Sequence, residues 1–531
     1  ISITNNGGAG KVTSIFLRGM KTEKILVLLD GIPLNNPSST DGQAFFEHIS
    51  LDNIEQIEII KGGLSSIWGS DASAGVINII TKKAKDGLHA SSNISYGSYD
   101  TKSAGANLSY KKDRFDALLA ISRFDNKGFS AKQPSSDEAD GYFNDTVNFK
   151  TNYHLNDRNS IGFNYNYIDA EIEYDGFGGS NDPAKAFITQ NDLAFSHTYQ
   201  IGFYTSLLNL TKSHSNRTHS DDTTYDATQQ ALKWLNKVAL ENTNFQYGFE
   251  LNTIEGSYQN AWGTDIKEKF NNDAIFANVN HRLGEIALLE AALRKDSFDT
   301  FEEQLSYKIG LKHFLHKEKQ LTLGLNYYKA IDTPNAYQVA NTVFGERLQP
   351  DQTKGYDISL FYQDTGITYF SNKISDRLTY DNENWGYINQ QGIENINGVE
   401  IETKHHFEAI NTLLTLNYTL LLKYEDDEGF ALEKIAEDTL NLSLDTYITD
   451  ATHFSIIGQY IGDRIEYEWN SHTIKAETGN YTLCHANFST QIMEDIDFSL
   501  HAKNILDKTY ESTYGYATEG RSIYANLKYS F

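Results

Sequence analysis

From about residue 86 to its end, the chain alternates between hydrophobic and polar residues with a period of two. Residues 147–155 show this pattern, and a polar turn at residues 156–159 leads into a second alternating run at residues 160–167. In the first run one face carries Val147, Phe149, Thr151, Tyr153 and Leu155, and the other carries Asn148, Lys150, Asn152 and His154. Successive side chains of a strand point to opposite faces, so the pattern predicts a β-hairpin with one apolar and one polar face.

The same alternation recurs in residues 321–327, 441–447 and 522–531. A soluble β-sandwich also alternates, but it would not sustain the pattern over so long a chain with so few apolar runs on the other face. We therefore predict a transmembrane β-barrel, whose strands carry apolar side chains toward the lipid and polar side chains toward the lumen.

The connections between the predicted strands fall into two classes. Short polar turns at residues 156–159, 316–319 and 449–452 alternate with predicted long loops at residues 124–145, 169–191 and 214–230. This asymmetry is typical of outer-membrane barrels, which have short periplasmic turns and long extracellular loops. At roughly 20 residues per strand with its connection, the chain after residue 85 has length for about 22 antiparallel strands. A barrel of that size has a lumen wide enough to need a plug.

The first 85 residues have a different pattern. Short apolar runs at residues 15–19, 25–35, 54–62 and 68–81 are separated by clusters of Gly, Asn, Asp and Ser. Such runs are typical of buried strands joined by tight turns. We predict that residues 1–85 form a small α/β plug domain inside the lumen, and that residues 86–531 form the all-β transmembrane barrel around it.

Composition supports a barrel and argues against several other classes. The mean hydropathy of −0.49 is too polar for a helical membrane protein, and no run approaches the ~18 apolar residues of a spanning helix. Aromatic residues make up 13% of the chain, which fits the interfacial girdles of a barrel. The formal net charge of −26 argues against a nucleic-acid partner, because a phosphate backbone selects basic surfaces.

Motifs that carry catalysis are missing from the sequence. Neither a nucleophile elbow, a zincin motif nor a phosphate loop appears. We therefore expect a protein that is not an enzyme. A passive porin or a surface adhesin on a barrel is a competing class, but an open diffusion pore has no use for a folded stopper.

Several motifs carry a resemblance to a known family. In the first domain these are residues 16–19 (Phe-Leu-Arg-Gly), 27–31 (Val-Leu-Leu-Asp-Gly), 57–62 (Ile-Glu-Ile-Ile-Lys-Gly) and 68–81; in the barrel they are residues 387–400, residues 504–510 and the terminal Phe531. With these motifs the chain resembles the TonB-dependent outer-membrane receptors. Through residues 3–10 and 510–516 it is most similar to the cobalamin transporter branch.

The resemblance implies a function, a location and partners. It implies active import of a scarce nutrient across the bacterial outer membrane, driven by TonB, with a corrinoid as the first expected substrate and a ferric siderophore as the second. Haem is less expected, although His48 in the plug keeps it open. Lipopolysaccharide, a surface lipoprotein, a phage and a colicin are further expected partners. The coupling segment that TonB captures is expected upstream of Ile1, and the first residues also lack the apolar run of a signal peptide.

The polar turns of the plug are the candidate ligand-binding segments, because the resemblance implies that apical plug loops touch substrate. Asn and Ser side chains offer uncharged donors and acceptors, which suit the amide-rich periphery of a corrinoid. The alternative is an ordinary Asn/Pro/Ser turn without a ligand. The candidate residues are Asn35, Asn36, Ser38, Ser39, Asp41, Leu64 and Ser65.

Two acidic groups are candidate cation ligands. Like charges side by side on a strand repel one another, and Ca²⁺ requires carboxylate oxygens of this kind. The resemblance to the cobalamin branch also implies Ca²⁺ in loops of this region. The first group is Asp169, Glu171, Glu173 and Asp175, and the second is Asp221, Asp222 and Asp226.

Two other interpretations of these acids stay open. The first group continues the odd-numbered, lipid-facing parity of residues 161–167. The acids therefore emerge just above the membrane in one interpretation, where they share divalent cations with lipopolysaccharide phosphates. In the other they are solvated charges.

Charged residues within the plug motifs suggest how the plug is held. A plug that moves under an external pull is better held by charged and hydrogen-bonded contacts than by an apolar interface. We expect Arg18 and Lys61, with Glu55 and Glu58, to serve this purpose, with lumen residues such as Lys150 as partners. The alternative is that these charges keep the plug soluble before assembly.

Overall fold

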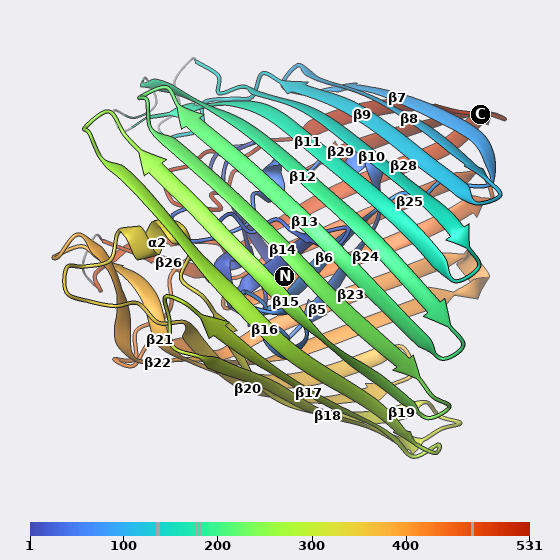
Figure 1. Ribbon diagram of the computed structural model, residues 1–531. Coiled ribbons are helices and arrows are strands. Elements are labelled where there is room, and N and C mark those ends of the chain that lie inside the picture. Colours follow the sequence, from blue (N-terminus) through green and yellow to red (C-terminus); the bar gives the residue numbers. More distant parts are fainter. Residues whose placement is uncertain (134–137, 177–178, 180–181, 469–471) are drawn as a thin grey trace.

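The computed structural model describes residues 1–133, 138–176, 179, 182–468 and 472–531. It is a closed antiparallel β-barrel with the N-terminal part of the chain folded inside it (Figure 1). Among the described residues, 22 strands form the barrel wall, as the sequence predicted. No helix of this described part is long and apolar enough to cross a membrane.

Barrel strands pair in chain order, with two exceptions. β25 pairs with β28, because β26 (Arg464–Tyr467) and β27 (Ile474–Thr478) form a hairpin of their own between them, and β30 pairs with β7 to close the barrel. The wall strands are β7 (Gly87–Gly97), β8 (Thr101–Lys112), β9 (Phe115–Asn126), β10 (Tyr142–Asn156), β11 (Asn159–Asp175), β12 (Pro183–Ile201), β13 (Tyr204–His219), β14 (Thr224–Ala239), β15 (Thr243–Gln259), β16 (Asp265–Leu283), β17 (Ala287–Phe298), β18 (Gln304–His316), β19 (Leu321–Asp332), β20 (Asp351–Tyr362), β21 (Thr365–Asp381), β22 (Gly386–Phe407), β23 (Thr412–Glu425), β24 (Asp438–Thr449), β25 (Thr452–Ile461), β28 (Tyr481–Met493), β29 (Ile496–Lys503) and β30 (Ser522–Ser530).

The predicted alternation of faces is confirmed along these strands. On β10, Tyr153 is 45% exposed on the outer face, whereas Asn148 and Lys150 on the other face contact the plug. The same holds for Ile275 on β16, which is 64% exposed on the outer face. The apolar face of each strand therefore points to lipid, and the polar face encloses the plug.

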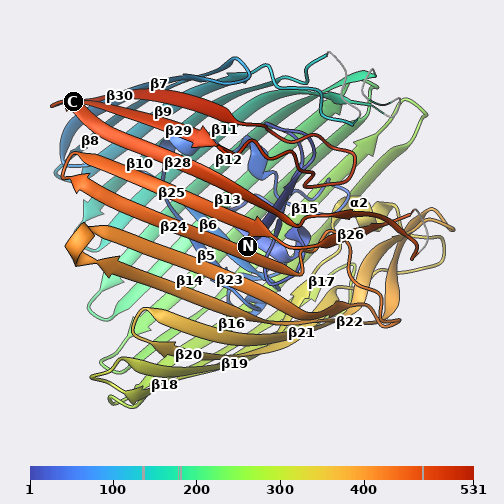
Figure 2. The ribbon, with the colours of Figure 1, turned by 180° about the vertical axis from the view of Figure 1, so that it is seen from behind.

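The two ends of the barrel differ as predicted. The short turns at residues 156–159 and 449–452 join strands at one end, where the chain also ends (Figure 2). The opposite end carries longer connections, including the segment between β19 and β20 that holds the short helix α2 (Ala336–Ala340). By the usual asymmetry of such barrels, the short-turn end is periplasmic and the other end is extracellular.

Two of the predicted long loops are wrong. In the segment predicted as the loop 169–191, β11 continues to Asp175 and pairs with β12, so that Asp169 lies opposite Thr189. Within residues 214–230, β13 runs to His219 and β14 begins at Thr224. The polar composition was misleading, because the backbone ladder continues above the membrane where apolar side chains are no longer required.

The third predicted loop is shorter than expected, since β9 and β10 leave only residues 127–141 between them. Residues 134–137 of this loop, with 177–178 and 180–181 of the predicted loop 169–191, lie outside the described residues.

The plug is built on a four-stranded sheet in the order β4-β3-β6-β5, in which β3 is parallel to β6. Every residue of β3 is buried, which explains its continuous apolar run. The plug elements are β1 (Ser2–Asn5), β2 (Thr13–Phe16), η1 (Thr22–Lys24), β3 (Ile25–Leu29), β4 (Ile32–Pro33), η2 (Phe46–His48), η3 (Leu51–Asn53), β5 (Ile54–Lys61), α1 (Ser65–Trp68) and β6 (Gly75–Thr81). The predicted boundary at residue 85 falls between β6 and β7.

The plug core continues into the barrel wall on one side. Leu17 and Val27 of the plug belong to one buried cluster with Phe370, Ile396 and Leu421 of β21, β22 and β23. The prediction of a largely polar plug–barrel contact is therefore incomplete. Apolar packing fixes the plug against these three strands, and polar contacts surround it elsewhere.

Candidate functional site

The apical plug turn, residues 35–42, is organised by its own side chains. Asn35 is 8% exposed. Its Oδ1 accepts a hydrogen bond from the backbone N–H of Val27 at 2.9 Å, and its Nδ2 donates to the carbonyl of Ile25 at 3.1 Å. Asn35 therefore ties the turn to β3 and fixes the height of the apex above the sheet.

The other predicted ligand residues of this turn mostly bond within it. Asn36 Oδ1 accepts from both the backbone N–H and the hydroxyl of Ser38, at 2.9 and 2.8 Å. Ser39 Oγ accepts from the backbone N–H of Gly42 at 2.7 Å. Burial raises the pKa of Asp41 to about 6. These internal hydrogen bonds hold the shape of the turn. Its backbone carbonyls point outward and accept hydrogen bonds from the barrel.

Helix α2 and β22 cover this apex. Asn335 is the N-cap of α2 and forms a capping box with Gln338, which explains a helix of only five residues in this connection. Asn335 Nδ2 also donates to the carbonyl of Ser39 at 2.9 Å, and Gln338 Nε2 donates to the carbonyl of Thr40 at 3.3 Å. The hydroxyl of Tyr387 donates to the same Thr40 carbonyl at 2.7 Å.

Leu64 and Ser65 lie at a second contact between plug and barrel. Leu64 packs into a small apolar cluster with Leu26 and Val76. Ser65 Oγ is 3.2 Å from both the carbonyl oxygen and the backbone nitrogen of Ile331 on β19, donating to the first and accepting from the second. These two residues hold α1 against β19. A role of either in binding substrate stays a prediction, as it does for the apical turn.

A group of aromatic side chains surrounds the covered apex. Tyr337 of α2 lies 5.2 Å from Tyr258, 5.8 Å from Tyr225 and 6.2 Å from Tyr387 between ring centroids. The guanidinium of Arg217 lies over Tyr225 at 4.4 Å and over Phe45 of the plug at 5.1 Å.

Sequence reasoning missed these aromatic residues. They are far apart in the chain, and only the high tyrosine content of 33 residues hinted at them.

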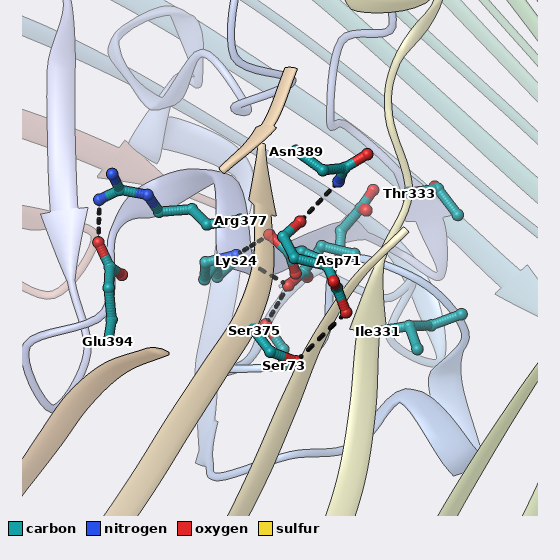
Figure 3. Close-up of polar contacts among 12 residues, drawn as sticks. Lys24, Asp71, Ser73, Ile331, Thr333, Ser375, Arg377, Asn389 and Glu394 are labelled. Atoms are coloured by element: carbon teal, nitrogen blue, oxygen red, sulfur yellow. Dashed lines mark hydrogen bonds and ion pairs between the residues drawn. The ribbon is translucent and has the colours of Figure 1, made fainter. Parts of the chain in front are cut away.

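A buried ion network lies beside the apex (Figure 3). Lys24 Nζ lies 3.2 Å from Asp332 and is hydrogen-bonded to Asp351, and all three side chains are at least nine-tenths buried. Burial opposes the charge of Lys24, but Asp332 and Asp351 outweigh it and raise the pKa of Lys24. Ser73 donates to Asp332 from the plug. Burial and the charge of Asp332 raise the pKa of Asp71, nearby, to about 7.

Three residues of the plug motifs form further ion pairs with the barrel. Arg18 and Lys61 both bind Glu400, each at 2.8 Å. Lys150 of β10 binds Asp30 at 2.7 Å. Arg18, Lys61 and Lys150 therefore make the contacts that were expected.

The predicted charges and lumen residues that remain act locally. Glu58 accepts from Asn78 within the plug, and Glu55 is exposed. Asn152 donates to Asp116 of the neighbouring barrel strand.

A cavity of about 570 Å³ separates the plug from part of the wall. On the barrel side it is lined mainly by β13 to β17, β21 and β22; on the plug side it reaches Asn35, Asn36 and Asp41. His48 does not line it, because the imidazole is 3% exposed and bonds through Nδ1 to the hydroxyl of Tyr142 at 3.1 Å. The predicted ligand turn therefore borders this cavity.

The first acidic group does not act as one cluster. Asp169 is exposed on the outer face of β11, and Glu171 and Glu173 bind the same cation, Lys185, at 2.7 and 2.8 Å. Lys185 thus relieves the repulsion that suggested a metal ion. Asp175 is separate and buried, with 6% exposure.

The second acidic group is equally dispersed. Asp221 and Asp222 lie in the turn between β13 and β14, where Asp221 accepts from the backbone N–H of Thr223. Asp226 lies on β14, 3.5 Å from His214. The convergence of the two groups on one Ca²⁺ stays a prediction without geometric support in the described part of the chain.

A different acidic cluster is present. Glu138, Asp140 and Asp175 each offer a carboxylate oxygen, and these oxygens lie within 4.8 Å of one another. Burial and the charge of Asp140 raise the pKa of Glu138 to about 7, and burial also raises the pKa of Asp140. Lys11 of the plug donates to the backbone carbonyl of Asp140 at 2.6 Å. Sequence reasoning did not predict that the loop before β10 meets the end of β11.

Two family models match the sequence. The TonB-dependent receptor plug domain matches residues 1–76, and the TonB-dependent receptor-like β-barrel matches residues 83–505. Together they span most of the chain.

Individual relatives were found by sequence and by structure. The vitamin B12 transporter BtuB of Vibrio cholerae serotype O1 is 26% identical over 551 aligned residues, covering 100% of this chain and 88% of the relative. The FrpB iron transporter of Neisseria meningitidis has a TM-score of 0.85 at 16% identity, covering 100% of this chain and 95% of that one. A mutant of the ferric enterobactin receptor PfeA of Pseudomonas aeruginosa has a TM-score of 0.84 at 16% identity, covering 100% and 94%. At that identity the solved structures show a shared fold.

Proposed function

We propose that this chain, which belongs to the TonB-dependent receptors, imports a corrinoid of the cobalamin type. The family places the chain in the bacterial outer membrane and makes it a transporter that draws energy through TonB. The sequence relative supports the substrate, because a protein named as a vitamin B12 transporter aligns with the whole chain.

The lining of the cavity is the observation that carries this proposal. Amides and hydroxyls supply about half of its polar side chains, and they pair with the amides of a corrinoid without a charge requirement. Four of the six cations of the described lining already bind carboxylates: Lys24 binds Asp332 and Asp351, Lys233 binds Glu250, Arg294 binds Glu250 and Asp296, and Arg377 binds Glu394. The amide and hydroxyl side chains include Asn35, Asn36, Asn209, Thr211, Gln229, Asn252, Asn272, Asn335 and Gln338.

A ferric siderophore is the second candidate, and Arg217 is the observation that favours it. Its guanidinium is stacked between Phe45 and Tyr225, and no carboxylate within 4 Å pairs with it in the described part of the chain. An anionic ferric chelate would supply the missing negative charge. Asp41 and Glu47 act on this guanidinium from beyond ion-pair distance, so an anion placed beside it would become its nearest negative partner.

Equilibrium binding to the purified protein separates the candidates. The probes are cyanocobalamin and a panel of ferric catecholate and hydroxamate siderophores. We expect saturable binding of cyanocobalamin, weakened by Tyr387→Ala in the cavity lining and left intact by Tyr356→Ala, an exposed tyrosine of the outer face. Binding of a ferric siderophore that Arg217→Gln weakens, with no binding of cyanocobalamin, would replace the proposed substrate.

Residues 1–85 and 86–531 act as two units in this proposal, a plug and a barrel. The packing of the plug core against β21 to β23 and the ion pairs of Arg18, Lys24 and Lys150 support a docked plug. Lipopolysaccharide, a surface lipoprotein, a phage and a colicin remain predicted partners at the outer face.

Ca²⁺ binding at Glu138, Asp140 and Asp175 is a second part of the proposal. The three carboxylates are hard oxygen donors of the kind that Ca²⁺ takes. One backbone N–H already reaches each aspartate, from Ala131 to Asp140 and from Lys132 to Asp175. Within the described ranges, the other oxygen of Asp175 has no hydrogen-bond partner. These residues therefore fit a cation better than the two groups predicted from the sequence.

Thermal unfolding with and without Ca²⁺ tests this site. We expect Ca²⁺ to raise the melting temperature and Asp140→Asn to abolish the shift, while Asp169→Asn with Asp221→Asn leaves it unchanged. The shift should shrink below pH 7, because protons compete at Glu138, whose pKa is raised to about 7. A shift lost in the Asp169/Asp221 variant instead would restore the sites predicted from the sequence.

A further inference from the structure

We infer that substrate leaves the apex along the wall of β13 to β17, while the plug stays attached to the opposite wall. The inference rests on the proposed import function and adds the path and the part of the plug that moves. It follows from an uneven distribution of contacts around the plug, from the position of the cavity and from the chemistry of the wall.

Polar contacts hold the plug on two sides of the barrel. Toward β7 to β10, Asp30 binds Lys150, and the Ser50 and Ser122 hydroxyls are hydrogen-bonded at 2.9 Å. Toward β19 to β22, Lys24 binds Asp332 and Asp351, and Arg18 and Lys61 bind Glu400. On these sides the plug cannot separate from the wall without breaking buried ion pairs.

The wall of β13 to β18 is different. Among the described residues, no hydrogen bond or ion pair joins the plug to these six strands. The plug meets them by packing, as where the Phe45 ring lies under the guanidinium of Arg217 at 5.1 Å. Separation on this side therefore breaks no buried ion pair, and it is the side on which the plug yields first.

The cavity already follows this wall over much of the height of the barrel. At the extracellular end it is lined by Asn335 and Tyr387, next to the plug apex. Toward the periplasmic turns it is lined by Leu207 of β13 and by Leu235 and Lys237 of β14, which ends at Ala239. Substrate on this side meets a preformed space rather than a packed interface.

The wall suits a large polar solute without net charge. Its inward side chains include Asn209, Thr211, Gln229 and Asn252. The charges at mid-height neutralise one another, because Lys233, Glu250, Arg294 and Asp296 form one connected network. A solute that exposes amides exchanges hydrogen bonds with this wall as it moves, whereas a multiply charged anion meets no free cation in the network.

One plug loop narrows the path. Residues 68–71 line the cavity, and a Cβ built on Gly69 would lie 3.3 Å from Arg294 Nη2. The loop thus passes in contact with the wall at Arg294 without a hydrogen bond to it, and Ser70 bonds instead to Thr333, just after the end of β19. Displacement of this loop breaks the Ser70–Thr333 contact and opens the path.

Two matched disulfide tethers test the inference. Ser70 Oγ lies 2.8 Å from Thr333 Oγ1 at the edge of the cavity, and Ser50 Oγ lies 2.9 Å from Ser122 Oγ on the attached side. The double variants S70C/T333C and S50C/S122C place a disulfide at each contact. Both are made in a Cys484→Ser background, since Cys484 is the single cysteine of the chain.

Uptake and surface binding of cyanocobalamin are measured in the same cells, oxidised and then reduced with dithiothreitol. We expect the oxidised S70C/T333C receptor to bind but to lose at least tenfold in uptake rate, with recovery on reduction. The oxidised S50C/S122C receptor should transport at the parent rate. Equal effects of the two tethers, or a loss confined to S50C/S122C, overturn the inference.

A second variant guards against a tethered receptor that does not assemble. Ala231 of β14 lines the cavity and takes no part in the tethered contact of Ser70 with Thr333. Ala231→Trp narrows the path without removing a hydrogen bond or ion pair of the plug, and we expect lower uptake with unchanged binding. Unchanged uptake contradicts the path. Absence of cyanocobalamin binding to the parent receptor rejects the proposed substrate instead and is therefore a distinct outcome.

Discussion

At the scale of single residues, the plug is held by a few buried charges whose partners come from distant parts of the chain. Lys24 has two carboxylate partners, and its side chain is 6% exposed. Lys61 has one partner, Glu400, and its side chain is 25% exposed. The two lysines therefore form a matched pair for measuring what burial adds to an ion pair.

Lys24→Met should loosen the plug far more than Lys61→Met. Removing Lys24 leaves two buried carboxylates without a counter-charge, which costs about 3 kcal/mol or more. The partly exposed pair of Lys61 is worth about 1 kcal/mol or less, and Glu400 keeps Arg18. The measurement is the temperature at which a protease cuts the plug of the purified receptor. A similar decrease in both variants would contradict a special role for Lys24.

Asp71 makes the stability of the plug depend on pH. Burial and the charge of Asp332 raise its pKa from an ordinary value of 3.8 to about 7 in the folded state. A carboxyl whose pKa is higher in the folded state than in the unfolded state stabilises the fold fully at any pH below its unfolded-state pKa. This stabilisation is lost as the pH rises through 7. Between about pH 4 and 7 the loss is at most about 1.4 kcal/mol per pH unit for one proton.

Asp71→Asn should therefore flatten the melting-temperature profile between pH 4 and 7 relative to the parent. Asp169→Asn, on the exposed outer face, serves as the control and should leave the profile unchanged. Parallel profiles for the parent and Asp71→Asn would show that this carboxyl titrates normally.

The sequence predicted some residue roles and missed others for a physical reason. Lys150 was assigned to the lumen by strand parity alone, and the structure pairs it with Asp30. Tyr225, Tyr258 and Tyr337 could not be grouped from the sequence, because their proximity depends on barrel register and on where α2 lies.

At the scale of elements, α2 shows how a five-residue helix positions the apex. Its capping box satisfies the first backbone N–H groups, and the same Asn335 side chain reaches the plug at Ser39. The lengths of two strands were predicted too short from their composition. Polar residues in β11 and β14 suggested loops, although backbone pairing continues through them. Polarity marks the end of the lipid band and does not mark the end of a strand.

Asn335→Ala should release α2 from the apex. Loss of an N-cap costs about 1 kcal/mol, so amide exchange over residues 336–341 should be roughly fivefold faster. Affinity for substrate should fall as well, because the covered apex opens. Glu346→Ala, an exposed change in the same connection, is the control. Equal exchange rates in the two variants would show that α2 is held by other contacts.

At the scale of the whole molecule, the period-two pattern, the length of the chain after residue 85 and the different pattern of the first 85 residues were sufficient to predict a plugged barrel of the observed strand number. What they could not predict is how the plug sits, because ion pairs such as Lys24 with Asp351 join residues hundreds of positions apart. The uneven attachment of the plug is a property of the assembled molecule only.

Ile275→Arg tests the membrane band directly. Ile275 lies near the middle of β16 and is 64% exposed on the outer face. An arginine at the bilayer midplane costs about 2–4 kcal/mol, whereas the cost near the interface is about 0–1 kcal/mol. Leu283→Arg, on the same face at the periplasmic end of the strand, is the matched control. The yield of folded receptor in a lipid refolding assay should fall only for Ile275→Arg. Equal yields for the two variants would show that Ile275 does not lie at the middle of the membrane band.

The most direct test of the central claim is uptake of radiolabelled cyanocobalamin by cells that lack their own corrinoid receptor and produce this one. Uptake should be saturable when TonB is present and fall to background when TonB is deleted, with surface binding retained in both strains. A ferric siderophore in excess should not compete. Accumulation of a ferric siderophore in place of cyanocobalamin, or corrinoid uptake that persists without TonB, would contradict TonB-dependent import of a corrinoid.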